Sequence, residues 1–165
     1  MEPISMHPLS ELAADAHTLE VDATSTYQEI VGFGGAFTEA AAINWRSLSD
    51  ADQQEVIRLY FAGPEDGGHG YTLGRVPMNS NDFTMGSYSF DDVPDDTALD
   101  FFDDSVAHDV NVGIIPMIQV AQAAVRARGA KLNILASPWS PPAWMKWPAG
   151  DWNQQSMLLS RAPNG

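Results

Sequence analysis

The sequence predicts an α/β fold in which parallel strands alternate with helices. Short runs rich in β-branched residues alternate along the chain with segments of helical period. Carboxylate, amide and tryptophan side chains that are candidates for a functional site come directly after the ends of the expected strands. Strands that alternate with helices favour parallel pairing, because a parallel pair needs a long crossover connection. We therefore expect one parallel sheet whose polar residues gather at a single edge.

Length and composition favour one packed domain, or a piece of a larger one. The 165 residues are 44% hydrophobic, which is ample for a packed core. With 22 acidic and 8 basic residues the formal net charge is −14, so neither nucleic acid nor an anionic membrane surface is an expected partner. The sequence has no cysteine, which excludes disulfides, thiolate metal sites and cysteine nucleophiles.

Residues 1–17 are expected to be a flexible leader, and residues 18–165 to be the folded part. The leader has neither a basic start nor an apolar stretch, so we expect no signal peptide here. No apolar run approaches the roughly 18 residues needed to span a membrane. Cytoplasmic and exported full-length forms both stay open.

The first expected strand lies within residues 18–37, which are rich in β-branched and aromatic residues and end in a glycine-rich turn. A helix follows within residues 47–64. Ser49 and Asp52 form a capping pattern at its start, and Gly63-Pro64 is a stop signal.

The second expected strand covers residues 71–78, and a polar, acidic loop covers residues 79–105. The next helix is expected from Ile114 to Arg128, followed by a strand over residues 131–138. The remaining residues, 139–165, are rich in Trp and Pro and have no helical period.

This order indicates the N-terminal part of a (β/α)8 barrel, with about three βα units. A complete barrel typically needs about 250 residues, so the barrel is expected to be incomplete and to end after its third strand. Barrel enzymes build their sites after the carboxyl ends of the strands. The unusual residues occupy that position: Glu39, Asn79, Asp82, Trp139 and Trp144.

Four motifs resemble glycoside hydrolase family 30, in its glucosylceramidase branch. They are GFGGAFTEAAA, YTLGRVPMNSNDF, YSFDDVPDD and LNILASPWSPPAWMK, and they occur in register over roughly residues 27–150. The resemblance implies a (β/α)8 barrel beside a small β-domain. It also implies retaining hydrolysis of β-glucosides such as glucosylceramide.

The resemblance implies three site residues in this chain. Glu39 falls where the family holds a carboxylate that accepts hydrogen bonds from glucose hydroxyls; the family has the shorter Asp there. Trp139 matches a tryptophan that lines the glucose subsite, where an indole face suits the C–H face of a pyranose. Arg75 matches an arginine beneath the nucleophile, which keeps that carboxylate ionised.

Each assignment has a structural alternative. Glu39 could instead be an acid at a helix N-terminus, Trp139 a packing residue, and Arg75 a member of an ordinary ion pair. For Asn79 and Asp82 a turn-forming role is favoured over a sugar contact.

Other aromatic and titratable residues are weaker candidates. Three tryptophans are expected to pack or to form the rim of an aglycone site: Trp144, Trp147 and Trp152. The four histidines show no metal-ligand spacing, and no nucleotide-binding motif occurs, so no metal and no organic cofactor are expected.

The catalytic pair is expected to be absent. Retaining hydrolysis needs two carboxylates about 5–5.5 Å apart. The resemblance implies an acid/base within an Asn-Glu-Pro motif after strand four and a nucleophile after strand seven. This sequence has no Asn-Glu-Pro, and its last glutamate is Glu65. We expect both catalytic glutamates beyond Gly165, and no hydrolysis by this chain alone.

Two classes of function follow. In the first, the chain is part of a retaining glycosidase and needs the rest of the barrel to act on its glycoside. In the second, it is a non-catalytic remnant or a sugar- or protein-binding fragment. An unclosed parallel sheet also predicts low stability and a tendency to aggregate.

Overall fold

The computed structural model describes residues 17, 19 and 21–146. The chain divides into two units, Met1–Val31 and Gly32–Gly165, and each is described by itself. Of the expected leader only residue 17 falls within the described part.

The first unit contains a turn at Asp22. The Asp22 carboxylate accepts hydrogen bonds from the backbone and hydroxyl of Thr24 and from the hydroxyl of Ser25, at 2.6–2.9 Å. These bonds lower the pKa of Asp22 to about 2.

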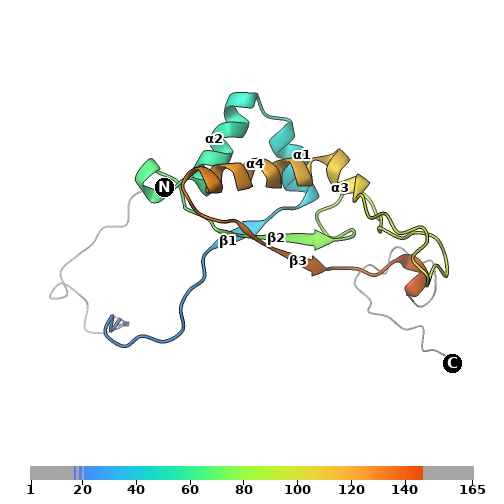
Figure 1. The fold of residues 1–165 in the computed structure, drawn as a ribbon, viewed down its shortest axis with the longest axis horizontal. Helices are drawn as coiled ribbons and strands as arrows, with labels where there is room; N and C mark the ends of the chain where they lie inside the picture. The colour runs from blue at the N-terminus through green and yellow to red at the C-terminus, as the bar shows by residue number, and fades with distance from the viewer. Residues whose placement is uncertain (1–16, 18, 20, 147–165) are drawn as a thin grey trace. The chain divides into compact units, whose positions relative to one another are not determined.

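The second unit holds the helices and strands (Figure 1). In chain order these are β1 (Gly34–Ala36), α1 (Glu39–Arg46), α2 (Asp50–Phe61), the 3-10 turn η2 (Pro64–Asp66), β2 (Leu73–Met78), α3 (Ala107–Val112), α4 (Ile114–Ala127), β3 (Asn133–Pro138) and the 3-10 turn η3 (Ala143–Met145).

The three strands form one parallel sheet in the order β1-β2-β3. This confirms the predicted fold class, an α/β arrangement of about three βα units that does not close into a barrel. The first strand, Gly34–Ala36, lies within the predicted range of residues 18–37, but it is formed at the glycines that were expected to make a turn. The described apolar residues before Gly32, which include Tyr27 and Ile30, are exposed and belong to no strand, so β propensity alone does not make a strand there.

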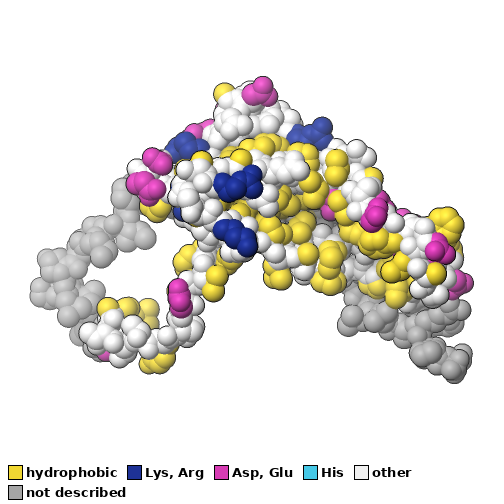
Figure 2. Space-filling view, viewed as in Figure 1, with side chains coloured by type: hydrophobic (Ala, Val, Ile, Leu, Met, Phe, Trp, Pro, Cys, Tyr) yellow, Lys and Arg dark blue, Asp and Glu magenta, His cyan; other side chains and the backbone are white. Residues whose placement is uncertain are grey.

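The helices cover one face of the sheet, and no element of the described residues covers the other, which we call the bare face (Figure 1). A Cβ on Gly74 would lie 2.6 Å from the Phe37 ring, so Gly74 faces the helical layer, with the partly buried Ile134 beside it. Side chains alternate along a strand, so Leu73 and Leu135 face the opposite way, and Leu135 is 66% exposed. In the same orientation, Figure 2 shows hydrophobic side chains at the surface of the sheet layer.

Local sequence explains the ends of the two long helices. At α2, the Ser49 hydroxyl accepts the Asp52 N–H (3.2 Å) and the helix ends before Pro64, as predicted. Helix α4 ends at Ala127, and Gly129 beyond it adopts φ +76°, which favours glycine. Its buried residues are Ile114, Ile118, Ala121 and Val125, which recur at helical spacing and pack into the core.

Two short helices were not predicted as such. Helix α1 follows Thr38, whose hydroxyl accepts the Ala41 N–H (3.2 Å), and it packs Ala42 and Trp45 into the core.

Helix α3 is capped by Asp103, which accepts the Ala107 N–H (2.8 Å) from outside the helix. None of the described helices is both long and apolar enough to cross a membrane.

Candidate sugar site

The three segments that leave the carboxyl ends of the strands meet at one edge of the sheet. Parallel pairing places the ends of β1, β2 and β3 side by side. Residues 37–39 follow β1, the loop of residues 79–106 follows β2, and residues 139–146 follow β3. The parallel pairing therefore explains why the segments that carry the candidate site residues lie at one edge of the sheet.

Arg75 and Trp139 lie against each other at this edge. The Arg75 guanidinium carbon is 4.6 Å from the centre of the Trp139 ring, which is a cation–π contact. The Trp139 backbone N–H donates to the Met78 carbonyl (3.3 Å), so the indole is attached to the end of β2. Trp139 is 42% exposed. Arg75 forms no ion pair with any described residue.

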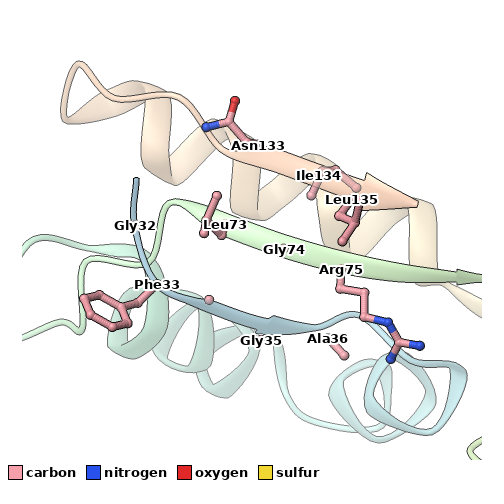
Figure 3. A pocket seen from close by; sticks show the side chains of 11 residues that line it. Gly32, Phe33, Gly35, Ala36, Leu73, Gly74, Arg75, Asn133, Ile134 and Leu135 are labelled. Carbon is pink, nitrogen blue, oxygen red and sulfur yellow. The ribbon is translucent and has the colours of Figure 1, made fainter. Parts of the chain in front are cut away.

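Arg75 also lines a groove of about 680 Å³ on the bare face of the sheet (Figure 3). The other side chains in this groove are mainly apolar, including Phe33, Leu73 and Leu135. Arg75 is therefore the positively charged group in a largely apolar groove.

Glu39 is buried at the first residue of α1, with 1% of its surface exposed. One carboxylate oxygen accepts the Met85 backbone N–H (2.9 Å), and the other lies 2.8 Å from His108 Nε2. Its place in the first helical turn suits a negative charge. The two bonds attach the loop of residues 79–106 and helix α3 to the start of α1.

His108 connects Glu39 to a second buried acid. Its ring stacks on Tyr88 with ring centres 3.6 Å apart, and the Tyr88 hydroxyl donates to Asp109 (2.9 Å). Burial raises the pKa of the Asp109 carboxyl, although the Tyr88 hydrogen bond and His108 oppose the shift. Burial, and then the Asp109 charge, raise the pKa of the Tyr88 hydroxyl.

Sequence reasoning did not identify this cluster. Glu39 and His108 are 69 positions apart, and a lone histidine has no local pattern that points to a distant carboxylate. The cluster depends on how the loop of residues 79–106 folds back onto α1.

Asn79 and Asp82 differ in their surroundings. Asn79 has φ 65°, donates to the Ser140 carbonyl (2.8 Å) and accepts the Phe90 N–H (3.0 Å), as expected for a turn residue. Asp82 is exposed and forms no side-chain hydrogen bond or ion pair with the described residues. Asp82 is thus a carboxylate open to a ligand at this edge.

Trp144 is a packing residue at the end of the described chain. Its indole N–H donates to the Asp91 carbonyl (2.9 Å). Trp147 and Trp152 lie outside the described residues. Within the described part, no group of three His, Cys, Asp or Glu side chains could hold a metal ion.

Comparison with known proteins identifies relatives of this chain. Residues 30–162 match the sequence model for the "Glycosyl hydrolase family 30 TIM-barrel domain". Putative glucosylceramidase 4 of Caenorhabditis elegans is 44% identical over 126 residues, which are 76% of this chain and 23% of that protein. Lysosomal acid glucosylceramidase of Mus musculus is 36% identical over 120 residues, 73% of this chain and 22% of that protein.

A solved structure shows the same arrangement. The crystal structure of SrfJ from Salmonella typhimurium aligns with a TM-score of 0.58 and 38% identity, over 72% of this chain and 24% of SrfJ. The chain spans about a quarter of the length of the curated relatives described here.

Proposed function

Because the chain belongs to glycosyl hydrolase family 30, we propose that it supplies part of the sugar subsite of a retaining glycosidase. The proposed substrate is glucosylceramide or a related β-glucoside. The observation that carries the proposal is the contact between Arg75 and Trp139 at the carboxyl edge of the sheet. Two residues assigned to the site from separate motifs thereby lie together.

Trp139 and Arg75 have complementary proposed roles. The indole offers an apolar surface to the C–H face of a pyranose, and its N–H can donate to a hydroxyl. The cation–π contact with Arg75 restrains the orientation of that ring. The guanidinium is always charged, so it would also favour the ionised form of a nucleophilic carboxylate brought beside it.

The carboxylate that binds the sugar hydroxyls has two candidates. Family resemblance favours Glu39, and each of its oxygens can accept a further hydrogen bond. Its burial and its bonds to Met85 and His108 mean that a sugar reaches it only if the loop of residues 79–106 moves. Exposure favours Asp82, which needs no such movement.

We propose that the two carboxylates needed for hydrolysis are not among the residues of this sequence. The glutamates of the chain end at Glu65, which lies in η2 before the second strand. We propose that the chain alone binds but does not hydrolyse, and that the remaining barrel provides the catalytic pair. A non-catalytic sugar- or protein-binding role is the second candidate, and this absence is the observation that favours it.

A chimera tests the proposal. Residues 30–146 would replace the matching segment of the mouse lysosomal acid glucosylceramidase, and hydrolysis of a β-glucoside would be measured. We expect activity in the chimera and none in the 165-residue chain alone. A folded chimera without activity, or turnover by the purified chain, would contradict the proposal.

Variants of the chimera separate the candidate residues. Trp139→Ala should lower kcat/KM by about tenfold or more, since it removes an aromatic sugar contact. If Asp82 holds the sugar, Asp82→Asn should lower kcat/KM far more than Glu39→Gln does. The reverse order would assign the hydroxyl contact to Glu39. Thermal unfolding of each variant distinguishes lost contact from lost fold.

A further inference from the structure

A second cavity lies at the same edge of the sheet, between the loop of residues 79–106 and the segment after β3. Its volume is about 440 Å³, which is large enough for a small organic molecule. The aromatic rings of Phe90, Phe102 and Trp144 line it, together with aliphatic side chains that include Leu99 and Met145.

The cavity is preformed, because hydrogen bonds join its two sides. Asn79 donates to the Ser140 carbonyl (2.8 Å) on one side and accepts the Phe90 N–H (3.0 Å) on the other. The Trp144 indole N–H donates to the Asp91 carbonyl (2.9 Å). Phe90 and Phe102 pack edge to face with ring centres 6.2 Å apart. A ligand would therefore enter a site whose walls are already positioned.

Two buried carboxylates line this cavity, and no Lys or Arg lines it. Asp96 is 8% exposed, and its oxygens accept the N–H groups of Asp100 (3.1 Å) and Phe101 (2.8 Å). Asp91 is 4% exposed. One of its oxygens accepts a long bond from the Val93 N–H (3.4 Å), and the buried Oδ2 has no hydrogen-bond partner among the described residues.

An ionised carboxylate with an unpartnered oxygen is costly to bury, and a cation beside it offsets that cost. Lys146 follows the cavity-lining Met145 and is buried, but it does not line the cavity, and its ammonium donates to the Ser140 hydroxyl (2.6 Å). The loop of residues 79–106 contains eight aspartates and no Lys or Arg. Figure 2 shows its acidic side chains at the surface without basic ones among them.

We propose that this cavity binds a small organic ammonium ion, with the charged group near Asp91 and the apolar part among the aromatic rings. Negative charge attracts the cation, and the faces of Trp and Phe rings add cation–π attraction. A neutral ligand of the same shape gains the apolar contacts alone, and an anion is repelled. The site does not depend on the proposed glycosidase function.

Titration of the full 165-residue chain tests this proposal. The probe is n-butylammonium chloride at constant ionic strength, and 1-butanol serves as the neutral comparison of similar size. The Trp144 indole N–H, assigned through Trp144→Phe, reports binding by NMR. We expect a saturable shift with n-butylammonium and binding at least about tenfold weaker with 1-butanol.

A matched pair of variants separates a specific site from general attraction. Asp91→Asn should weaken n-butylammonium binding by about tenfold, since it removes the charge at the cavity. Asp104→Asn removes the same charge from an exposed position in the same loop, so it should change affinity by less than about twofold.

Three results would overturn the proposal: equal weakening by the two variants, equal binding of 1-butanol, or no saturation in the unaltered chain. If Asp91→Asn does not fold, Phe102→Leu replaces it. Phe102 is 44% exposed, so this change removes a π face with little effect on folding. It should weaken n-butylammonium binding several-fold and leave 1-butanol binding nearly unchanged; equal loss for both probes would refute a cation site.

Discussion

The two faces of the sheet differ in what covers them. On the helical face, Phe37, Ile57 and Ile118 are each less than one-tenth exposed and belong to one continuous core. On the bare face, Leu135 is 66% exposed, although it is a large apolar residue. Parallel sheets are normally covered on both faces. The helical face thus has a packed core, whereas no described element packs on the bare face.

This comparison has a direct consequence for the carboxyl edge of the sheet. Arg75 lies on the bare face and Trp139 follows β3, so the candidate sugar residues adjoin the uncovered surface. In a closed barrel the inward-facing side chains of the strands form a packed interior. An exposed apolar surface of the sheet thus lies next to the residues proposed to bind substrate.

The sharpest test of the comparison removes one large side chain from each face. Ile57→Ala should lower the free energy of unfolding by about 2–5 kcal/mol, because Ile57 is 2% exposed and its loss leaves a cavity. Leu135→Ala should change it by less than about 0.5 kcal/mol. Urea unfolding followed by circular dichroism measures both. Equal losses would mean that the bare face is packed in solution.

A smaller effect is expected on self-association. Leu135→Asn should reduce association of the chain several-fold, since it interrupts the exposed apolar surface of the sheet. Leu59→Asn is the matched control, because Leu59 is 41% exposed but lies on α2 in the helical layer. Sedimentation velocity at a series of concentrations measures the change. A monodisperse unaltered chain with a sharp thermal transition would contradict the expected tendency to aggregate.

The smallest expected effect concerns the buried cluster that attaches the long loop to the helical layer. The folded-state pKa of Asp109 is raised above its ordinary 3.8, so the folded state binds this proton more tightly than the unfolded state does. Its contribution to stability is therefore present below pH 3.8 and is lost as the pH rises through the folded-state pKa.

Asp109→Asn should remove this part of the pH dependence, because the amide does not titrate there while its oxygen can still accept the Tyr88 hydroxyl. Urea midpoints measured from about pH 3 to pH 7 should show the unaltered chain losing stability relative to the variant as the pH rises. Parallel curves for the two proteins would show that Asp109 titrates alike in the folded and unfolded states.

The elements predicted from sequence are those whose signals are local. Helix α2 was predicted from the capping pair Ser49 and Asp52, and α4 from its periodicity and Gly129. Strands β2 and β3 were predicted from short apolar runs. Helix α3 gave no such signal, because its first residue follows Val106 in a left-handed conformation and its cap comes from Asp103.

The features of the candidate site also divide into those that the sequence alone determines and those that depend on folding. Its residue types, the absence of a later glutamate and the resemblance to the family are properties of the chain alone, because each depends on residue identity and order. The Arg75–Trp139 contact, the burial of Glu39 against His108 and the cavity beside Asp91 depend on folding. Parallel crossovers and a long loop bring together residues that are tens of positions apart. No local sequence pattern specifies which distant residues come together. These contacts and the cavity are therefore determined by the tertiary structure alone.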